Sequence, residues 1–250
     1  MDANKRMFKF MSHDLIKGAG MFWLVMIIVN IASYLIPYLI SSNTVIGPMI
    51  RAGQSMTYAG SNFFAVFIFF IVYSIEMYYE NFTLAIGFGG TRKNFFINLL
   101  INTLIIVLLF ATIQIILLKI DYHVVSFMGY EPIVEYGFFN ISEDNILSNI
   151  LSLSFIFLVQ VSITNFIGVM QYRFSYKFWI GLGIFVLLSQ RITNFIGRFF
   201  GGIVDYDHFI GILSEGNFIS SNQSFFAIGL IIMLVAYSIG YAFIRRANVK

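Results

Sequence analysis

Long runs of apolar residues dominate the chain, and short polar connections separate them. Such a run crosses about 30 Å of hydrocarbon as a helix of roughly 20 residues. Runs of about this length cover Gly20 to Ile40, Phe63 to Tyr79, Asn94 to Leu118, Ile146 to Met170, Phe178 to Asn194 and Phe225 to Phe243. No sustained alternation with a period of two runs through them, so helices are expected rather than barrel strands. The pattern predicts an all-α integral membrane protein with six transmembrane helices, forming a single transmembrane domain over residues 1–250.

Composition agrees with a chain that is solvated by lipid. Hydrophobic residues make up 59% of it and charged residues 11%, whereas charged residues are about 25% of an ordinary soluble domain. The chain has no cysteine, which removes disulfides, thiolate nucleophiles and thiolate metal ligands. Its net charge of +3 comes from basic residues beside the apolar runs, which favours contact with anionic lipid headgroups over nucleic acid.

Basic residues collect on one side of the predicted helices. Four connections on that side hold most of them, namely Lys5, Arg6, Lys9 and Lys17, then Arg92 and Lys93, then Arg173 and Lys177, and finally Arg245, Arg246 and Lys250. The segments 119–145 and 199–224, on the other side, are mainly acidic. Because Lys and Arg accumulate in cytoplasmic loops, we expect a multi-pass plasma-membrane protein with both termini in the cytoplasm and these two segments outside the cell.

Residues 1–18 predict an amphipathic helix that lies in the membrane interface. Its apolar face, expected to sit in the acyl boundary, holds residues at positions i, i+3, i+4 and i+8, namely Met7, Phe10, Met11 and Leu15. Gly18 and Gly20 would supply a bend into the first span. An ordinary charged lead-in that only fixes topology is the alternative interpretation.

The connection at 80–93 is the most distinctive local signal. Residues Phe82 to Phe88 predict a short, half-buried helix on the cytoplasmic face, and the glycines that follow permit a tight reversal. The run resembles a phosphate loop only superficially, because such a loop needs Gly, four residues, Gly, Lys and then Ser or Thr. Here Arg92 and Lys93 follow Thr91 and a membrane span comes next. The chain is therefore not expected to bind ATP itself.

Several polar residues interrupt the apolar runs. They are candidates for lining a transport pathway, although hydrogen bonding between helices would explain them equally well; they comprise Gln114, Gln160, Asn165, Gln190 and Arg191. Arg191 either snorkels to the outer headgroups or lines a mouth. Segment 199–224 is too apolar for a free loop and too broken for a span, so it predicts a re-entrant segment before the last helix.

This layout, with the turn Gly89-Gly90-Thr91-Arg92-Lys93-Asn94-Phe95-Phe96, resembles the type-2 permease of ATP-binding-cassette (ABC) exporters over nearly the whole chain. The resemblance implies a homodimer or heterodimer with a second permease, and a separate ATPase subunit that binds ATP and Mg. It makes Met7 to Ile16 a connecting helix, and it implies coupling to the ATPase through Phe82, Thr83, Ile86, Gly87, Phe88, Gly90, Thr91, Arg92 and Lys93. The long 119–145 connection departs from the family pattern.

The same resemblance implies export rather than catalysis, with no cofactor bound by this chain. Small bacterial exporters of this kind handle membrane-active peptides such as phenol-soluble modulins, so amphipathic peptides or other hydrophobic molecules are the expected cargo.

Two other functions stay open. An ion-coupled secondary transporter usually has an ionisable residue near the bilayer centre, and Glu76, close to the cytoplasmic boundary, is the sole acidic residue inside a predicted span. The other is an intramembrane enzyme: a metalloprotease needs clustered His and carboxylate ligands, whereas His13, His123 and His208 are far apart in sequence and outside the spans. A serine enzyme would need a Ser–His pair, and none presents itself within the predicted spans. No catalytic or metal-binding residue is therefore expected.

Overall fold

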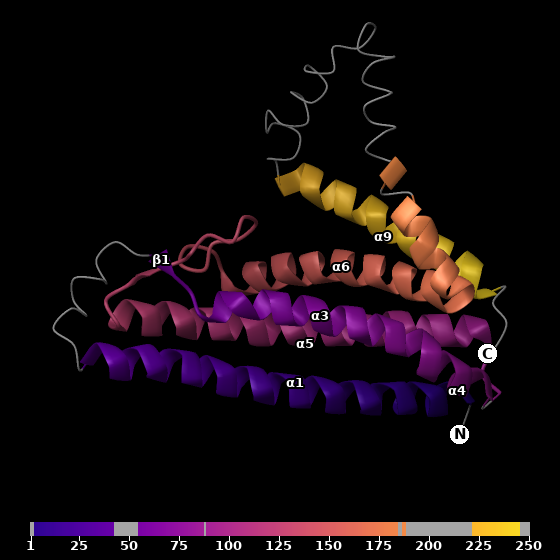
Figure 1. The fold of residues 1–250 in the computed structure, drawn as a ribbon, viewed down its shortest axis with the longest axis horizontal. Helices are drawn as coiled ribbons and strands as arrows, with labels where there is room; N and C mark the ends of the chain where they lie inside the picture. The colour runs from indigo at the N-terminus through magenta and orange to yellow at the C-terminus, as the bar shows by residue number, and fades with distance from the viewer. Residues whose placement is uncertain (1–2, 43–54, 88, 185–186, 189–221, 246–250) are drawn as a thin grey trace, which may run out of the picture. The chain divides into compact units, whose positions relative to one another are not determined.

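The computed structural model describes residues 3–42, 55–87, 89–184, 187–188 and 222–245. These residues are mainly helical (Figure 1). They include five helical segments long and apolar enough to cross a membrane, namely Lys5–Ile36, Ala59–Gly87, Arg92–Phe127, Ile146–Phe174 and Phe226–Arg245. The prediction of an all-α, multi-pass membrane protein is confirmed at this level.

The remaining predicted span and the re-entrant segment fall largely outside the described residues. Of the span expected at Phe178 to Asn194, residues 178–184 and 187–188 are described, and they are helical. Of 199–224, only the last three residues are described, and they begin the final helix.

The chain divides into two units, 1–161 and 162–250. The first unit contains most of the described elements, in the order α1 (Ala3–Ser42), β1 (Ser55–Met56), η1 (Ala59–Ser61), α3 (Asn62–Glu76), η2 (Met77–Asn81), α4 (Phe82–Gly87), α5 (Arg92–Phe127), β2 (Glu131–Pro132) and the first part of α6 (Ile146–Phe174). The two-residue strands β1 and β2 pair in parallel and join the two connections at one end of the helices. The second unit contains the rest of α6 and α9 (Asn222–Arg245).

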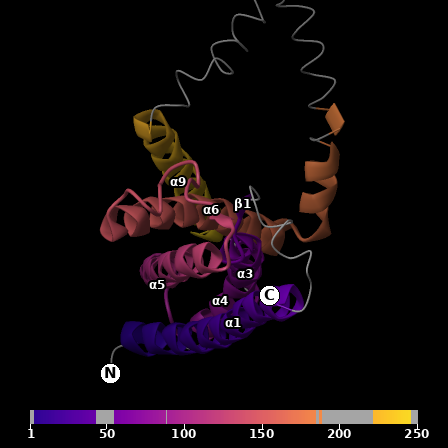
Figure 2. The ribbon, with the colours of Figure 1, turned by 90° about the vertical axis from the view of Figure 1, so that its left-hand side faces the viewer.

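Helices α1 and α5 run side by side in the same direction (Figures 1 and 2). Near the start of both, the Ser12 hydroxyl donates a hydrogen bond of 2.8 Å to Asn102 Oδ1. Near the end of both, the Tyr34 hydroxyl donates one of 2.9 Å to Asp121 Oδ1. The contacts advance together along both helices, which fixes the parallel register.

Helix α3 runs antiparallel to α5. Asn62, at the start of α3, donates a hydrogen bond of 3.3 Å to Gln114, late in α5. Phe82, beyond the end of α3, packs edge-on against Phe95, early in α5, with ring centroids 5.1 Å apart. Successive spans of this unit therefore alternate in direction, as a chain that repeatedly crosses a bilayer must.

An aromatic cluster joins these helices at mid-length. Its centre is Phe110 of α5, whose ring is fully buried. Rings from α1 and α3 surround it with centroids 4.8–5.3 Å away, and they belong to Phe22, Trp23, Phe69 and Phe70. Such contacts between helices supply the close packing that has to replace a hydrophobic driving force inside lipid.

The amino-terminal segment differs from its prediction. Helix α1 continues without interruption through Gly18 and Gly20, so 1–18 does not form a separate helix over its described residues. Its apolar face packs into the protein instead of the acyl boundary, because Met7, Met11 and Leu15 are all buried. Buried residues continue at the same spacing of four residues through Ala19 and Trp23, so this apolar face belongs to a single long helix.

Helix α5 also exceeds its prediction. It ends at Phe127 rather than at Leu118, so the connection predicted at 119–145 begins as helix. The physical reason is that distant parts of the chain supply partners: the Lys119 ammonium donates to the carbonyl of Ile141, and the Asp121 carboxylate accepts several hydrogen bonds. Charged residues can lie within a membrane-spanning helix when such partners are present.

In the second unit, the end of α6 lies against the end of α9. Arg173 donates a hydrogen bond of 3.3 Å to the carbonyl of Phe243, and its guanidinium lies 4.8 Å from the centroid of that ring. One turn earlier in both helices, a Cβ atom placed on Gly240 would lie 3.9 Å from Cγ2 of Val169. The two helices therefore run parallel where they meet.

Candidate functional site

Helix α4 and the turn after it form the segment expected to bind an ATPase. Phe82 has an exposed fraction of 0%, because its ring packs against Phe95. Ala85 is also buried, while Ile86 is half-buried. Leu84, which is not among the predicted coupling residues, is the large apolar side chain that faces outward, with 43% exposed. Phe82 thus anchors the segment, and Leu84 is available for contact.

The turn between α4 and α5 depends on two glycines. Gly89 has a φ of +79°, a conformation that glycine adopts at little cost. The Gly90 N–H donates a hydrogen bond of 2.9 Å to the carbonyl of Ala85. A Cβ on Gly90 would lie 2.6 Å from that oxygen and 3.2 Å from the sulfur of Met7. The turn is therefore packed tightly against the beginning of α1.

Thr91 starts the next helix. It has an extended backbone, and its hydroxyl accepts a hydrogen bond of 3.1 Å from the Asn94 N–H, as an N-cap does. Thr91 and Lys93 are exposed, and Arg92 is half-buried.

The structure brings much of the predicted coupling region and the predicted connecting helix together. Met7 touches the turn at Gly90, and Met11 and Leu15 continue the same buried face, whereas Phe10 is half-buried. Thr83 is half-buried and Gly87 is exposed; Phe88 lies outside the described residues.

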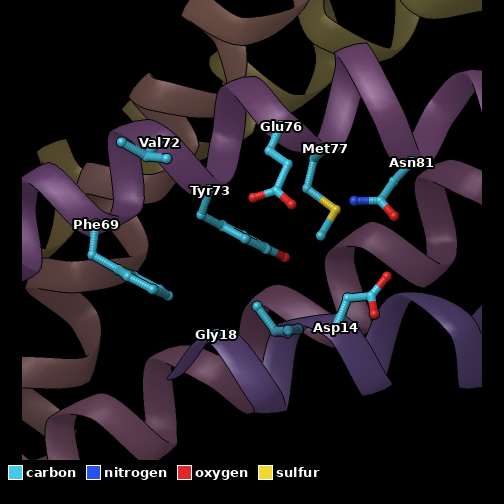
Figure 3. A pocket seen from close by; sticks show the side chains of 9 residues that line it. Asp14, Gly18, Phe69, Val72, Tyr73, Glu76, Met77 and Asn81 are labelled. Carbon is cyan, nitrogen blue, oxygen red and sulfur yellow. The ribbon is translucent and has the colours of Figure 1, made fainter. Parts of the chain in front are cut away.

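A pocket of about 100 Å³ opens between α1 and α3, close to this segment (Figure 3). Its apolar lining consists of Leu15, Gly18, Phe69, Val72, Tyr73 and Met77. Its polar lining consists of Asp14, Glu76 and Asn81. No sequence pattern predicts this pocket, because Asp14 and Glu76 lie far apart along the chain.

The backbone beside the pocket is unusual. Residues Met77–Asn81 form a π-helical turn, η2, between α3 and α4. Such turns are rare, occur mostly as single bulges inside α-helices and are frequent at functional sites. This turn supplies both Met77 and Asn81 to the pocket lining.

A buried carboxylate organises the opposite end of the first unit. Asp121, with 2% exposed, accepts hydrogen bonds from the Tyr34 hydroxyl at 2.9 Å and the Thr57 hydroxyl at 2.7 Å. It also accepts from the N–H groups of Tyr58 at 3.2 Å and Ala59 at 3.4 Å. These N–H groups begin the helical segment that leads into α3, so the carboxylate acts as a cap supplied by another helix.

The outer connection joins this network through Tyr136. Its hydroxyl donates a hydrogen bond of 3.1 Å to Thr57 Oγ1. Burial raises the pKa of Tyr136, the negative charge of Asp121 raises it further, and the hydrogen bond with Thr57 acts in the opposite direction. The net effect keeps this hydroxyl protonated and able to donate.

The predicted pathway residues lie in different settings. Gln114 is buried and binds the carbonyl of Ala59 at 2.8 Å, so it joins α5 to η1. Gln160 donates a hydrogen bond of 3.2 Å to the carbonyl of Phe67. Asn165 is buried in the second unit, and its side chain has no hydrogen-bond partner within the described part of the chain. Gln190 and Arg191 lie outside the described residues.

In the described ranges, no group of three His, Asp or Glu side chains is placed to hold a metal ion. No family model, curated protein or solved structure matches this chain.

Proposed function

We propose that this chain is the membrane subunit of an ABC exporter. It forms half of a translocation pathway with a second copy or a paralogue, and a separate ATPase subunit supplies the energy. Amphipathic peptides or other hydrophobic molecules are the proposed cargo. The observation that carries the proposal is the packing of the beginning of α1 against the turn after α4, through Met7 and Gly90.

That packing suits a segment that transmits force. A push on α4 would reach α5 through the Phe82–Phe95 ring contact, and it would reach α1 through the Gly90–Met7 contact. Both contacts involve fully or nearly fully buried side chains, which favours movement of these helices as rigid bodies.

The direction of the helices supports six crossings with both termini in the cytoplasm. The spans of the first unit alternate, whereas α6 and α9 run parallel at Arg173 and Phe243. Two parallel spans that follow one another in a multi-pass chain need one further crossing between them. We assign that crossing to the span expected at Phe178 to Asn194, of which the described residues 178–184 and 187–188 are helical.

The test is purification of the tagged full-length chain from membranes of its own host. We expect an ATPase subunit with a complete phosphate-loop sequence to co-purify, together with vanadate-sensitive ATP hydrolysis. Replacing exposed Leu84 by Asp should reduce the amount of this subunit more than tenfold, because a buried charge without a partner costs an interface several kcal/mol.

Ser142→Asp is the matched control, since Ser142 is also exposed but lies in the connection between α5 and α6. This variant should retain the ATPase subunit at the wild-type level. Equal retention by Leu84→Asp and Ser142→Asp would remove the coupling role of α4, and absence of any ATPase subunit from the wild-type preparation would contradict the proposed function.

A further inference from the structure

The pocket between α1 and α3 concentrates negative charge. Asp14 and Glu76 enter its lining from different helices, and none of its nine lining residues is basic. Asp14 and Glu80 are the two acidic side chains that act electrostatically on Glu76. Carboxylates gathered at the edge of a membrane span favour a cationic occupant, because a cation relieves their mutual repulsion.

Asn81 gives the pocket a second polar feature. The side chain is 96% buried, since its exposed fraction is 4%. Figure 3 shows its amide nitrogen pointing toward Met77, in the space between η2 and α1 that Asp14 and Glu76 also line. No described residue forms a hydrogen bond with this amide. A buried amide that faces a cavity without a protein partner is suited to bind a ligand.

The rest of the lining is apolar and partly aromatic. Leu15, Phe69, Val72 and the ring of Tyr73 lie beside the carboxylates. Apolar walls next to acidic groups match a molecule with a cationic head and an adjoining hydrocarbon or aromatic portion. At about 100 Å³ the pocket is large enough for a head group or one side chain and too small for a whole peptide.

We infer that this pocket binds the head of a cationic amphiphile, an ammonium or guanidinium group that adjoins an apolar chain. Asp14 and Glu76 accept its N–H groups, rotation of the Asn81 amide brings its oxygen to the head group as a further acceptor, and the apolar chain lies along Phe69 and Val72. The inference builds on the proposed function, which places this end of the helices at the inner leaflet. There the pocket would capture cargo before export.

The experiment measures binding of dodecylammonium to the purified full-length chain in phosphatidylcholine nanodiscs, by equilibrium dialysis against empty nanodiscs. We expect saturable binding of one molecule per chain above lipid partitioning. The double variant Asp14→Asn, Glu76→Gln should weaken it about tenfold or more, since hydrogen bonds to charged groups are the strong ones. Asn81→Leu should weaken it severalfold.

Glu143→Gln is the control, because it removes one exposed negative charge from the connection between α5 and α6. It should bind dodecylammonium like the wild type, and neutral dodecanol should show lipid partitioning only. Binding that never saturates, or that the double variant retains in full, would overturn the inference. The assay contains no ATPase, so its failure is separate from failure of the proposed function, which is decided by co-purification.

Discussion

At the scale of single residues, Asp121 is the side chain on which the structure differs most from its interpretation in sequence. The sequence placed it among the acidic residues of an outer loop, yet it is buried in α5 and accepts hydrogen bonds from Tyr34, Thr57, Tyr58 and Ala59. No local pattern announces this role, because all four donors lie 62 to 87 residues away along the chain. Only tertiary packing brings them together.

We predict that Asp121→Asn destabilises the protein by about 1–3 kcal/mol, since an amide cannot accept from all these donors and leaves some of them buried without a partner. The free energy of unfolding, measured by titration with a denaturing detergent in mixed micelles, checks this. Glu143→Gln, on an exposed side chain, should change it by less than about 0.5 kcal/mol.

The variant Asp121→Asn also distinguishes a permease from an ion-coupled carrier. Asp121 is a buried acidic residue inside the span-length helix Arg92–Phe127, and this observation favours the carrier more than the sequence did. If Asp121 carried the coupling ion, Asp121→Asn would abolish proton- or sodium-driven flux in proteoliposomes while the unfolding free energy stayed at the wild-type value. If instead Asp121→Asn lowers the unfolding free energy and the wild type shows no proton- or sodium-driven flux, Asp121 acts as a structural cap.

At the scale of elements, the turn between α4 and α5 offers a direct comparison between two glycines. A Cβ on Gly90 would lie 2.6 Å from the carbonyl oxygen of Ala85, whereas one on Gly87 would meet nothing within 4 Å. We predict that Gly90→Ala lowers the midpoint of thermal unfolding, because backbone has to move. Gly87→Ala should leave the midpoint unchanged or raise it slightly, since Ala favours a helix by up to about 1 kcal/mol over Gly.

Differential scanning fluorimetry of both variants in one detergent gives this comparison. Similar midpoints for Gly90→Ala and Gly87→Ala would show that the turn has more room than the structure indicates. The ATPase co-purification of each variant adds a second measurement, which should fall for Gly90→Ala if the turn transmits force to α1.

An element can be predicted from the sequence when the residues that stabilise it lie close together along the chain. The apolar runs gave the described spans, because length and composition alone determine whether a helix suits a bilayer. The predicted bend at Gly18 and Gly20 is absent from the helix. A glycine within a helix costs only about 1 kcal/mol, and the buried face from Met7 to Trp23 continues past both glycines and outweighs that cost. The inward face of α4 depends on Phe95, which the local pattern could not specify.

At the scale of the whole molecule, the number of crossings decides the side on which the chain ends. If Lys93 is cytoplasmic, α5 carries the chain outward to Ser142 and α6 brings it back. If α6 ends in the cytoplasm, α9, which runs parallel to α6 at Val169–Gly240 and Arg173–Phe243, ends there too, and the plan with six spans needs one further crossing between them. A plan with five crossings would instead put the carboxyl end outside the cell.

The absence of cysteine from the chain makes this testable with single substitutions. We predict that a membrane-impermeant maleimide labels Ser142→Cys in intact cells, and labels Lys93→Cys and Lys250→Cys only after permeabilisation. Labelling of Lys250→Cys in intact cells, with Lys93→Cys still protected, would mean an odd number of crossings. The ATPase surface at α4 and the chain's end would then lie on opposite sides, which no permease with six spans allows.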